Sequence, residues 1–192
     1  MKHSIFRIGL LIAILFTYSN CYSQCKKGEL IISGRSDFIN YSSYKSRLSG
    51  GVQLDLFISK NISIYSRIAF GERYIHTSFT PLVNYNNFPR IGIEAIILSL
   101  FIPEGVSFYI PINKKISLSP TIGILSFEVI DDNHNSGFKL NNIGFAYNPS
   151  IGLKLNFIMN KNIILSPQIS KNYLLGINKH GFSGTITFGI LL

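Results

Sequence analysis

The chain has 192 residues, of which only 14% are charged, and its formal net charge at pH 7 is +9. This charged fraction is well below the roughly 25% of soluble globular chains, although no segment supplies the 18 uninterrupted apolar residues of a membrane-spanning helix. The length fits one domain. High hydropathy without a spanning helix favours a protein that crosses a membrane with strands.

The first 23 residues have the pattern of a secretory signal peptide. Lys2, His3 and Arg7 precede a short apolar run over 8–16, which is too short to span a bilayer. We expect cleavage after Ser23, which leaves residues 24–192 as one domain. A rival interpretation makes Cys21 or Cys25 a lipidated terminus, but the residues before these cysteines are not the small ones that a lipoprotein signal requires.

Loss of the signal peptide removes two basic residues, which lowers the net charge from +9 to +7. A basic surface could bind nucleic acid or an anionic membrane. The basic residues are scattered along the sequence and form no nucleic-acid-binding motif, so we expect no nucleic-acid partner. Solvated turns are the simplest interpretation of these charges, and lipopolysaccharide phosphates are a possible partner for them in an outer membrane.

The strand pattern begins with a candidate strand over 29–36 and a polar loop over 37–49. Apolar and polar residues then alternate over 50–59 and again over 62–70, on either side of a turn at Lys60 and Asn61. Two alternating runs that flank a tight turn predict a β-hairpin.

That turn recurs twice. The sequences are SKNISI over 59–64, NKKISL over 113–118 and NKNIIL over 160–165, and the last two both continue with Ser-Pro. Tight turns spaced by two strands and one longer connection predict an up-and-down meander, with short turns on one side and long loops on the other.

The number of strands depends on residues 74–112. One long loop before a strand over 106–112 gives eight strands in total, whereas additional strands over 74–83 and 91–101 give ten. Turn sequences over 84–89 and 103–105 favour ten. The apolar run over 96–102 lacks alternation, and a short helix packed on or in the barrel is the alternative there.

The last twelve residues, 181–192, form the most regular segment. Even positions carry Phe182, Ile186, Phe188, Ile190 and Leu192, and odd positions from 181 to 189 carry only glycine, serine and threonine. A period of two indicates a strand, and the length is sufficient for a tilted strand to cross a bilayer. We therefore expect the closing strand of an all-β, antiparallel transmembrane barrel.

The chemistry of the polar faces indicates which side is inside. A soluble barrel covers its outer surface with Lys and Glu, whereas the polar faces here are mostly Gly, Ser, Thr, Asn and Gln, which fill a narrow lumen. Pairing Ser59 with Ser63 across the first turn would place Asp55 opposite Arg67, so we predict an ion pair between them in the lumen. An exposed pair in a soluble sheet is the alternative.

With signal peptide, hairpin meander, small polar face and apolar closing strand, residues 28–192 resemble the small outer-membrane β-barrel proteins of Gram-negative bacteria. One departure is the final Leu192, where such chains usually end in an aromatic residue. The resemblance implies a monomer in the outer membrane that is inserted by the barrel-insertion machinery and contacts lipid and lipopolysaccharide. The family includes structural and surface-interaction proteins, narrow channels and lipid-modifying enzymes, so the fold does not select a function.

A structural or surface-interaction role with exposed loops is the leading hypothesis, and a small passive channel is an alternative. The other alternative is a hydrolase that uses His76, Ser78 and Glu94 as base, nucleophile and orienting acid, because His76-Thr77-Ser78 resembles the His-x-Ser motif of the lipid A deacylases, with Phe79 where that family has Asn. His134 and His180 are too isolated for a metal site. We expect neither a metal nor a cofactor.

Overall fold

The structure is a computed structural model that describes residues 25–41, 46–71, 74–77, 98–131, 143–160, 162–175 and 179–192. The expected signal peptide, Met1 to Ser23, lies outside these ranges.

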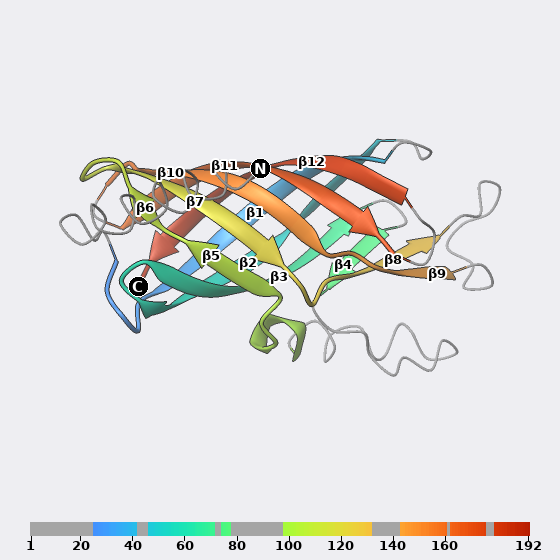
Figure 1. The fold of residues 1–192 in the computed structure, drawn as a ribbon, viewed down its shortest axis with the longest axis horizontal. Helices are drawn as coiled ribbons and strands as arrows, with labels where there is room; N and C mark the ends of the chain where they lie inside the picture. The colour runs from blue at the N-terminus through green and yellow to red at the C-terminus, as the bar shows by residue number, and fades with distance from the viewer. Residues whose placement is uncertain are drawn as a thin grey trace, which may run out of the picture.

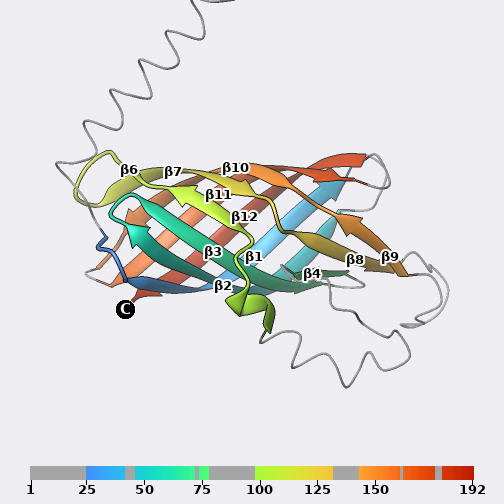
Figure 2. The same ribbon diagram turned by 60° about the horizontal axis from the view of Figure 1, so that its bottom comes forward.

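Eight strands form a closed antiparallel ring, because β2 pairs with both β1 and β3 and so closes the sheet on itself. In ring order the strands are β1 (Leu30–Tyr41), β2 (Arg47–Ser59), β3 (Ile62–Gly71), β5 (Gly105–Phe108), β7 (Ile116–Gly123), β10 (Ser150–Ile158), β11 (Ile163–Leu174) and β12 (Lys179–Leu191). Figures 1 and 2 show this barrel from two sides.

Three positions in the ring are each occupied by more than one strand. β3 pairs with β5 over Ile62–Tyr65 and with β4 (Tyr74–Thr77) over Ile68–Gly71. β4 then pairs with β8 (Phe127–Asp131), and β8 pairs with β9 (Ile143–Tyr147), so these three strands continue the wall beyond β5, β7 and β10. An isolated bridge between Tyr147 and Leu175 joins β9 to the β11 side. The barrel wall therefore has eight strand positions around its circumference from one end to the other.

This pairing decides between the two predicted strand counts. The observed count of eight lies within the predicted range of eight to ten. The ten-strand alternative, which the turn sequences favoured, is wrong because β3 pairs directly with β5 and β5 directly with β7, which leaves no place for two more strands between them. Within the predicted strand over 91–101, the structure describes 98–101, and these residues are helical. This helical turn lies outside the barrel wall (Figures 1 and 2), and the Ser66 hydroxyl on β3 donates a hydrogen bond to the Leu100 carbonyl.

The short turns lie together at one end of the barrel, which we call the short-turn end. The turn at Lys60 and Asn61 joins β2 to β3 as predicted, and residues 112–115 join β6 (Ile110–Pro111), which continues β5, to β7. The segment before β1 reaches the same end, because the Gly28 amide donates to the Phe57 carbonyl and the Leu192 amide donates to the Leu30 carbonyl. The connections that follow β8 and β11 leave from the opposite end.

The side chains alternate between an apolar outer face and a polar lumen. On β12, Phe182, Ile186 and Phe188 are 53 to 59% exposed, whereas Thr185 and Thr187 are 2 to 3% exposed. The same alternation runs along β1 and β2. The prediction that small polar residues face inward is confirmed. This is the inverse of a soluble barrel, whose apolar side chains would fill the interior. None of the described helical residues forms a segment long and apolar enough to cross a membrane.

Candidate functional site: the polar lumen

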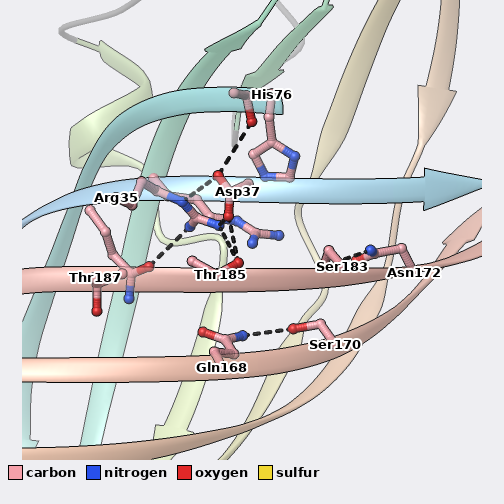
Figure 3. A network of polar contacts seen from close by, with 12 residues as sticks. Arg35, Asp37, His76, Gln168, Ser170, Asn172, Ser183, Thr185 and Thr187 are labelled. Carbon is pink, nitrogen blue, oxygen red and sulfur yellow. Dashed lines mark hydrogen bonds and ion pairs between the residues drawn. The ribbon is translucent and has the colours of Figure 1, made fainter. Parts of the chain in front are cut away.

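A first polar cluster lies on the lumen side of the neighbouring strands β1, β2 and β12 (Figure 3). The Arg35 guanidinium forms an ion pair with Asp37, two residues along the same strand, and its Nε donates to Asp37 Oδ2 at 2.8 Å. The Thr185 hydroxyl also donates to Asp37, and Arg35 Nη1 donates to Gln53 Oε1 at 3.0 Å. All four side chains are buried. Their charges are satisfied inside the barrel, which a buried ionised pair requires.

The polar contacts continue from this cluster toward the short-turn end. Gln53 Nε2 donates to Asp55 Oδ2 at 2.8 Å, and Asp55 Oδ1 accepts a bond from Lys154 Nζ at 3.2 Å. Lys154 Nζ also donates to the Tyr109 hydroxyl at 3.1 Å and lies 5.3 Å from the centre of that ring. Arg35, Gln53, Asp55, Lys154 and Tyr109 thus form one connected line of polar contacts along the lumen.

A second cluster is centred on Glu104, where the chain enters β5. Arg67 Nε lies 2.6 Å from both carboxylate oxygens of Glu104, and the two side chains form a buried ion pair. His76 Nε2 is 3.2 Å from Glu104 Oε2 and 3.2 Å from the Ser126 hydroxyl. The Glu104 carbonyl accepts hydrogen bonds from the amides of Ile124 and Leu125. Glu104 therefore holds the wall together with its backbone and fills the lumen with its side chain.

Neutral side chains from β7, β10, β11 and β12 fill the rest of the described lumen. Asn156 Nδ2 donates to the hydroxyls of Ser117 at 3.0 Å and Ser119 at 2.7 Å, and its oxygen accepts from Ser166. Further contacts run from Gln168 to Ser170 and from Asn172 to Ser183 (Figure 3). Amides and hydroxyls that bond to one another make a packed polar interior, because buried polar groups find partners among their neighbours.

An apolar floor, made of Cys25, Ile31, Phe57, Tyr109 and Ile164, lies below the polar line at the short-turn end. The Phe57 and Tyr109 rings lie 4.7 Å apart between centres. Burial, helped by nearby Glu29, raises the pKa of the Cys25 thiol to about 12, so the thiol is neutral at physiological pH. Two cavities remain, one beside Arg35 and Asp37 and the other beside Cys25 and Tyr109, and each has room for about one water molecule. Side chains therefore fill most of the lumen at these two levels.

The predicted ion pair between Asp55 and Arg67 is wrong, although both side chains do face the lumen and are buried. Ser59 pairs with Ile62 instead of Ser63, and a β-bulge between Phe57 and Ser59 shifts the register by one more residue. Arg67 therefore lies opposite Gln53, and Asp55 opposite Tyr65. Each charge takes another partner: Arg67 pairs with Glu104, and Asp55 with Lys154. An extra residue in a β-bulge is not visible in the alternation of the sequence.

Of the proposed hydrolase residues, Ser78 and Glu94 lie outside the described part of the chain, and His76 is buried in the lumen. Two groups that contact His76, the Glu104 carboxylate and the Ser126 hydroxyl, both meet the same ring nitrogen, Nε2. A proton relay needs the hydroxyl on one ring nitrogen and the acid on the other. The lumen position also directs His76 away from the lipid-facing wall, where a lipid substrate would lie.

Among the described residues, no three His, Cys, Asp or Glu side chains form a cluster that could hold a metal ion. His180 lies at the start of β12 and is exposed, and His134 falls outside the described ranges. Two charged residues of the lumen, Lys154 and Glu104, were not identified from the sequence. Lys154 occupies the polar side of an alternating run, which marks it as inward-facing, whereas Glu104 sits in a Pro-Glu-Gly sequence that resembles a simple turn.

No protein-family model matches the sequence, and none of the curated proteins matches it significantly. Solved structures do match the fold. The outer membrane protein OprG from Pseudomonas aeruginosa has a TM-score of 0.54 at 11% identity, over 88% of this chain and 98% of OprG. The attachment invasion locus protein Ail of Yersinia pestis, solved with the heparin analogue sucrose octasulfate, gives 0.52 at 11% identity, over 86% and 99%. De novo designed transmembrane β-barrels give 0.50 at 10% identity, over 88% and 98%. The chain therefore has the fold of the small outer-membrane β-barrel proteins.

Proposed function

We propose that this protein is an integral outer-membrane β-barrel with a structural or surface-interaction role, exported by its N-terminal signal peptide and oriented with its long connections outside the cell. The observation that supports the proposal best is the inverted alternation, in which large apolar side chains cover the outer face and polar side chains fill the lumen. β1, β2, β11 and β12 have 12 or 13 residues each, more than the roughly 9 to 11 that a tilted strand needs to cross a bilayer.

A passive channel is less well supported than an anchored scaffold. The polar line from Arg35 to Tyr109 and the apolar floor around Cys25 and Phe57 occupy the cross-section of the described lumen. An eight-stranded barrel is just wide enough for side chains to fill it. The parts of the chain left to carry a specific role are the connections at the end opposite the short turns, which is where surface interactions are expected for such a barrel. We expect lipid, lipopolysaccharide and the barrel-insertion machinery as partners, and a monomeric state.

The test uses two single-cysteine variants of the mature chain in which Cys25 is replaced by Ser. Ile186→Cys places the label on the outer face, and Thr187→Cys places it in the lumen one residue away. In bilayers that contain lipids with quenching groups in their acyl chains, we expect strong quenching of the label at 186 and weak quenching at 187. Equal quenching at both positions, or a chain that stays soluble without detergent or lipid, would exclude the proposed membrane barrel.

The channel alternative has its own measurement. Reconstituted barrel in a planar bilayer is expected to give no conductance above the leak of the lipid alone. Stable single-channel steps from the wild-type chain would favour the channel over the structural role, because the side chains that close the lumen would then have to move aside.

A further inference from the structure

The fold gathers at the short-turn end lysines that are scattered in the sequence. Five of them are exposed there, and they come from three separate segments. They are Lys26 and Lys27 before β1, Lys60 between β2 and β3, and Lys114 and Lys115 between β6 and β7. We call this group the lysine rim. Because the three segments lie beside strands that are neighbours in the ring, the positive charges follow an arc of the barrel rim from β1 through β2, β3 and β5 to β7.

Few negative groups at this end balance the lysine rim. Among the described residues, Glu29 is the acidic side chain on the surface there, and it already accepts a hydrogen bond from the Lys26 amide at 2.7 Å. Asp55 points into the lumen and is bound by Lys154, so it does not reduce the surface potential. The rim therefore carries a net positive charge that can attract an anionic surface.

The lysine rim borders directly on the apolar outer face, which indicates what kind of partner it meets. Ile58, Ile112, Met159 and Leu192 lie at the same end and are 46 to 65% exposed. Long lysine side chains beside such a surface place their stems on apolar groups and their ammonium groups at the level of lipid headgroups. A soluble anionic protein or nucleic acid would not need this apolar border, whereas a bilayer has an apolar core directly beneath its charged headgroups.

We propose that the lysine rim binds anionic glycerophospholipid headgroups of the leaflet at the short-turn end, in preference to zwitterionic ones. The inference rests on the proposed membrane location and adds a lipid preference to it. The recognised group is a phosphodiester whose negative charge is not cancelled by an amine on the same headgroup, as in phosphatidylglycerol. Several ammonium groups along this arc hold such lipids, because each lysine near the surface contributes its own electrostatic attraction.

The experiment measures how strongly spin-labelled lipids associate with the mature full-length barrel in phosphatidylcholine bilayers. The probes are spin-labelled phosphatidylglycerol and spin-labelled phosphatidylcholine. For the wild type we expect phosphatidylglycerol to be favoured by about fivefold, the ratio that corresponds to roughly one lysine's attraction. In about 0.5 M NaCl this ratio should fall toward one, since salt screens exposed charges.

Three variants assign the effect to the rim. Lys27→Gln, Lys114→Gln and Lys115→Gln combined should reduce the ratio to about one, whereas the same three positions changed to Arg should keep it, since the charge remains. Lys171→Gln, which removes a charge from β11 near the opposite end, should leave the ratio unchanged. These turn side chains are exposed, so all variants are expected to fold.

Two results would overturn the inference while leaving the membrane barrel intact: a wild-type ratio near one with both lipids immobilised at the barrel surface, or a triple Gln variant that keeps the wild-type ratio. If neither labelled lipid is immobilised, the chain is not in the bilayer, and the proposed function itself fails.

Discussion

Lys154 and Asp55 are 99 positions apart in the chain, yet Nζ of Lys154 lies 3.2 Å from Oδ1 of Asp55 inside the lumen. They come from β10 and β2, which are not neighbours in the ring. The pair therefore links two walls of the barrel across its interior. Both side chains are 3% exposed or less, so neither charge can be solvated if its partner is removed.

Removal of one partner should be costly. Lys154→Met leaves the Asp55 carboxylate buried without its cation, and we expect a loss of about 3 to 5 kcal/mol of unfolding free energy. Asp55→Asn should have a loss of similar size. The double variant should be more stable than the sum of the two losses predicts, because it leaves no unpaired charge. Urea unfolding of all four proteins in lipid vesicles measures this, and strictly additive losses would argue against a direct pair.

Gly51 allows β2 and β3 to approach closely. A Cβ at this position would lie 1.9 Å from the Ile68 carbonyl oxygen, whereas a Cβ at Gly184 meets no atom within 4 Å. We expect Gly51→Ala to reduce stability by about 1 to 3 kcal/mol, as overpacking does, and Gly184→Ala to have little effect. The unfolding midpoints of the two variants test the prediction. Equal midpoints would mean that the backbones can separate at little cost.

Neighbouring positions on β12 should respond differently to arginine. Ile186→Arg places a charge on the outer face, and near the bilayer midplane this should cost about 2 to 4 kcal/mol. Thr187→Arg inserts a large side chain into the packed lumen, where the Thr187 hydroxyl now donates to the Ser166 carbonyl. Bilayer thickness separates the two losses of stability. A thinner bilayer should reduce the loss from Ile186→Arg and leave the loss from Thr187→Arg unchanged. A lumen variant that responds to bilayer thickness as strongly as Ile186→Arg would contradict the assigned faces.

The hydrolase alternative has a direct chemical test. We expect lipid A from cells that express the wild type to have the same mass as lipid A from cells that express Ser78→Ala. The buried His76 does not face lipid in this structure, which is the physical reason for the expectation. A lower mass equal to one lost acyl chain, with the wild type only, would establish deacylation and replace the proposed structural role.

The alternation of the sequence was sufficient to predict the all-β fold, the closing strand and the inward direction of Asp55 and Arg67. The partners of these two charges were not predictable, since the pairing of Ser59 with Ile62 and the bulge beside it together change every pairing along the hairpin. The role of Glu104 was also not predictable from the sequence. It contacts Arg67 and His76, which are distant from it in the sequence, and these contacts depend on where the chain enters β5. Local periodicity carries information about faces, whereas contacts across the lumen depend on long-range register.

β4 and β5 occupy the same position in the ring, so the segment between them can change without a change in the strands on either side. The chain departs after Thr77 and returns at Gly105, yet β3 remains paired on both sides of the break through Ile68 and Tyr65. Closure of the ring does not depend on how long the intervening segment is, and lengthening a flexible loop costs only about 0.6 kcal/mol per doubling. The wall can therefore accept insertions or deletions in this segment during evolution, or a grafted sequence, without a change in strand number or diameter.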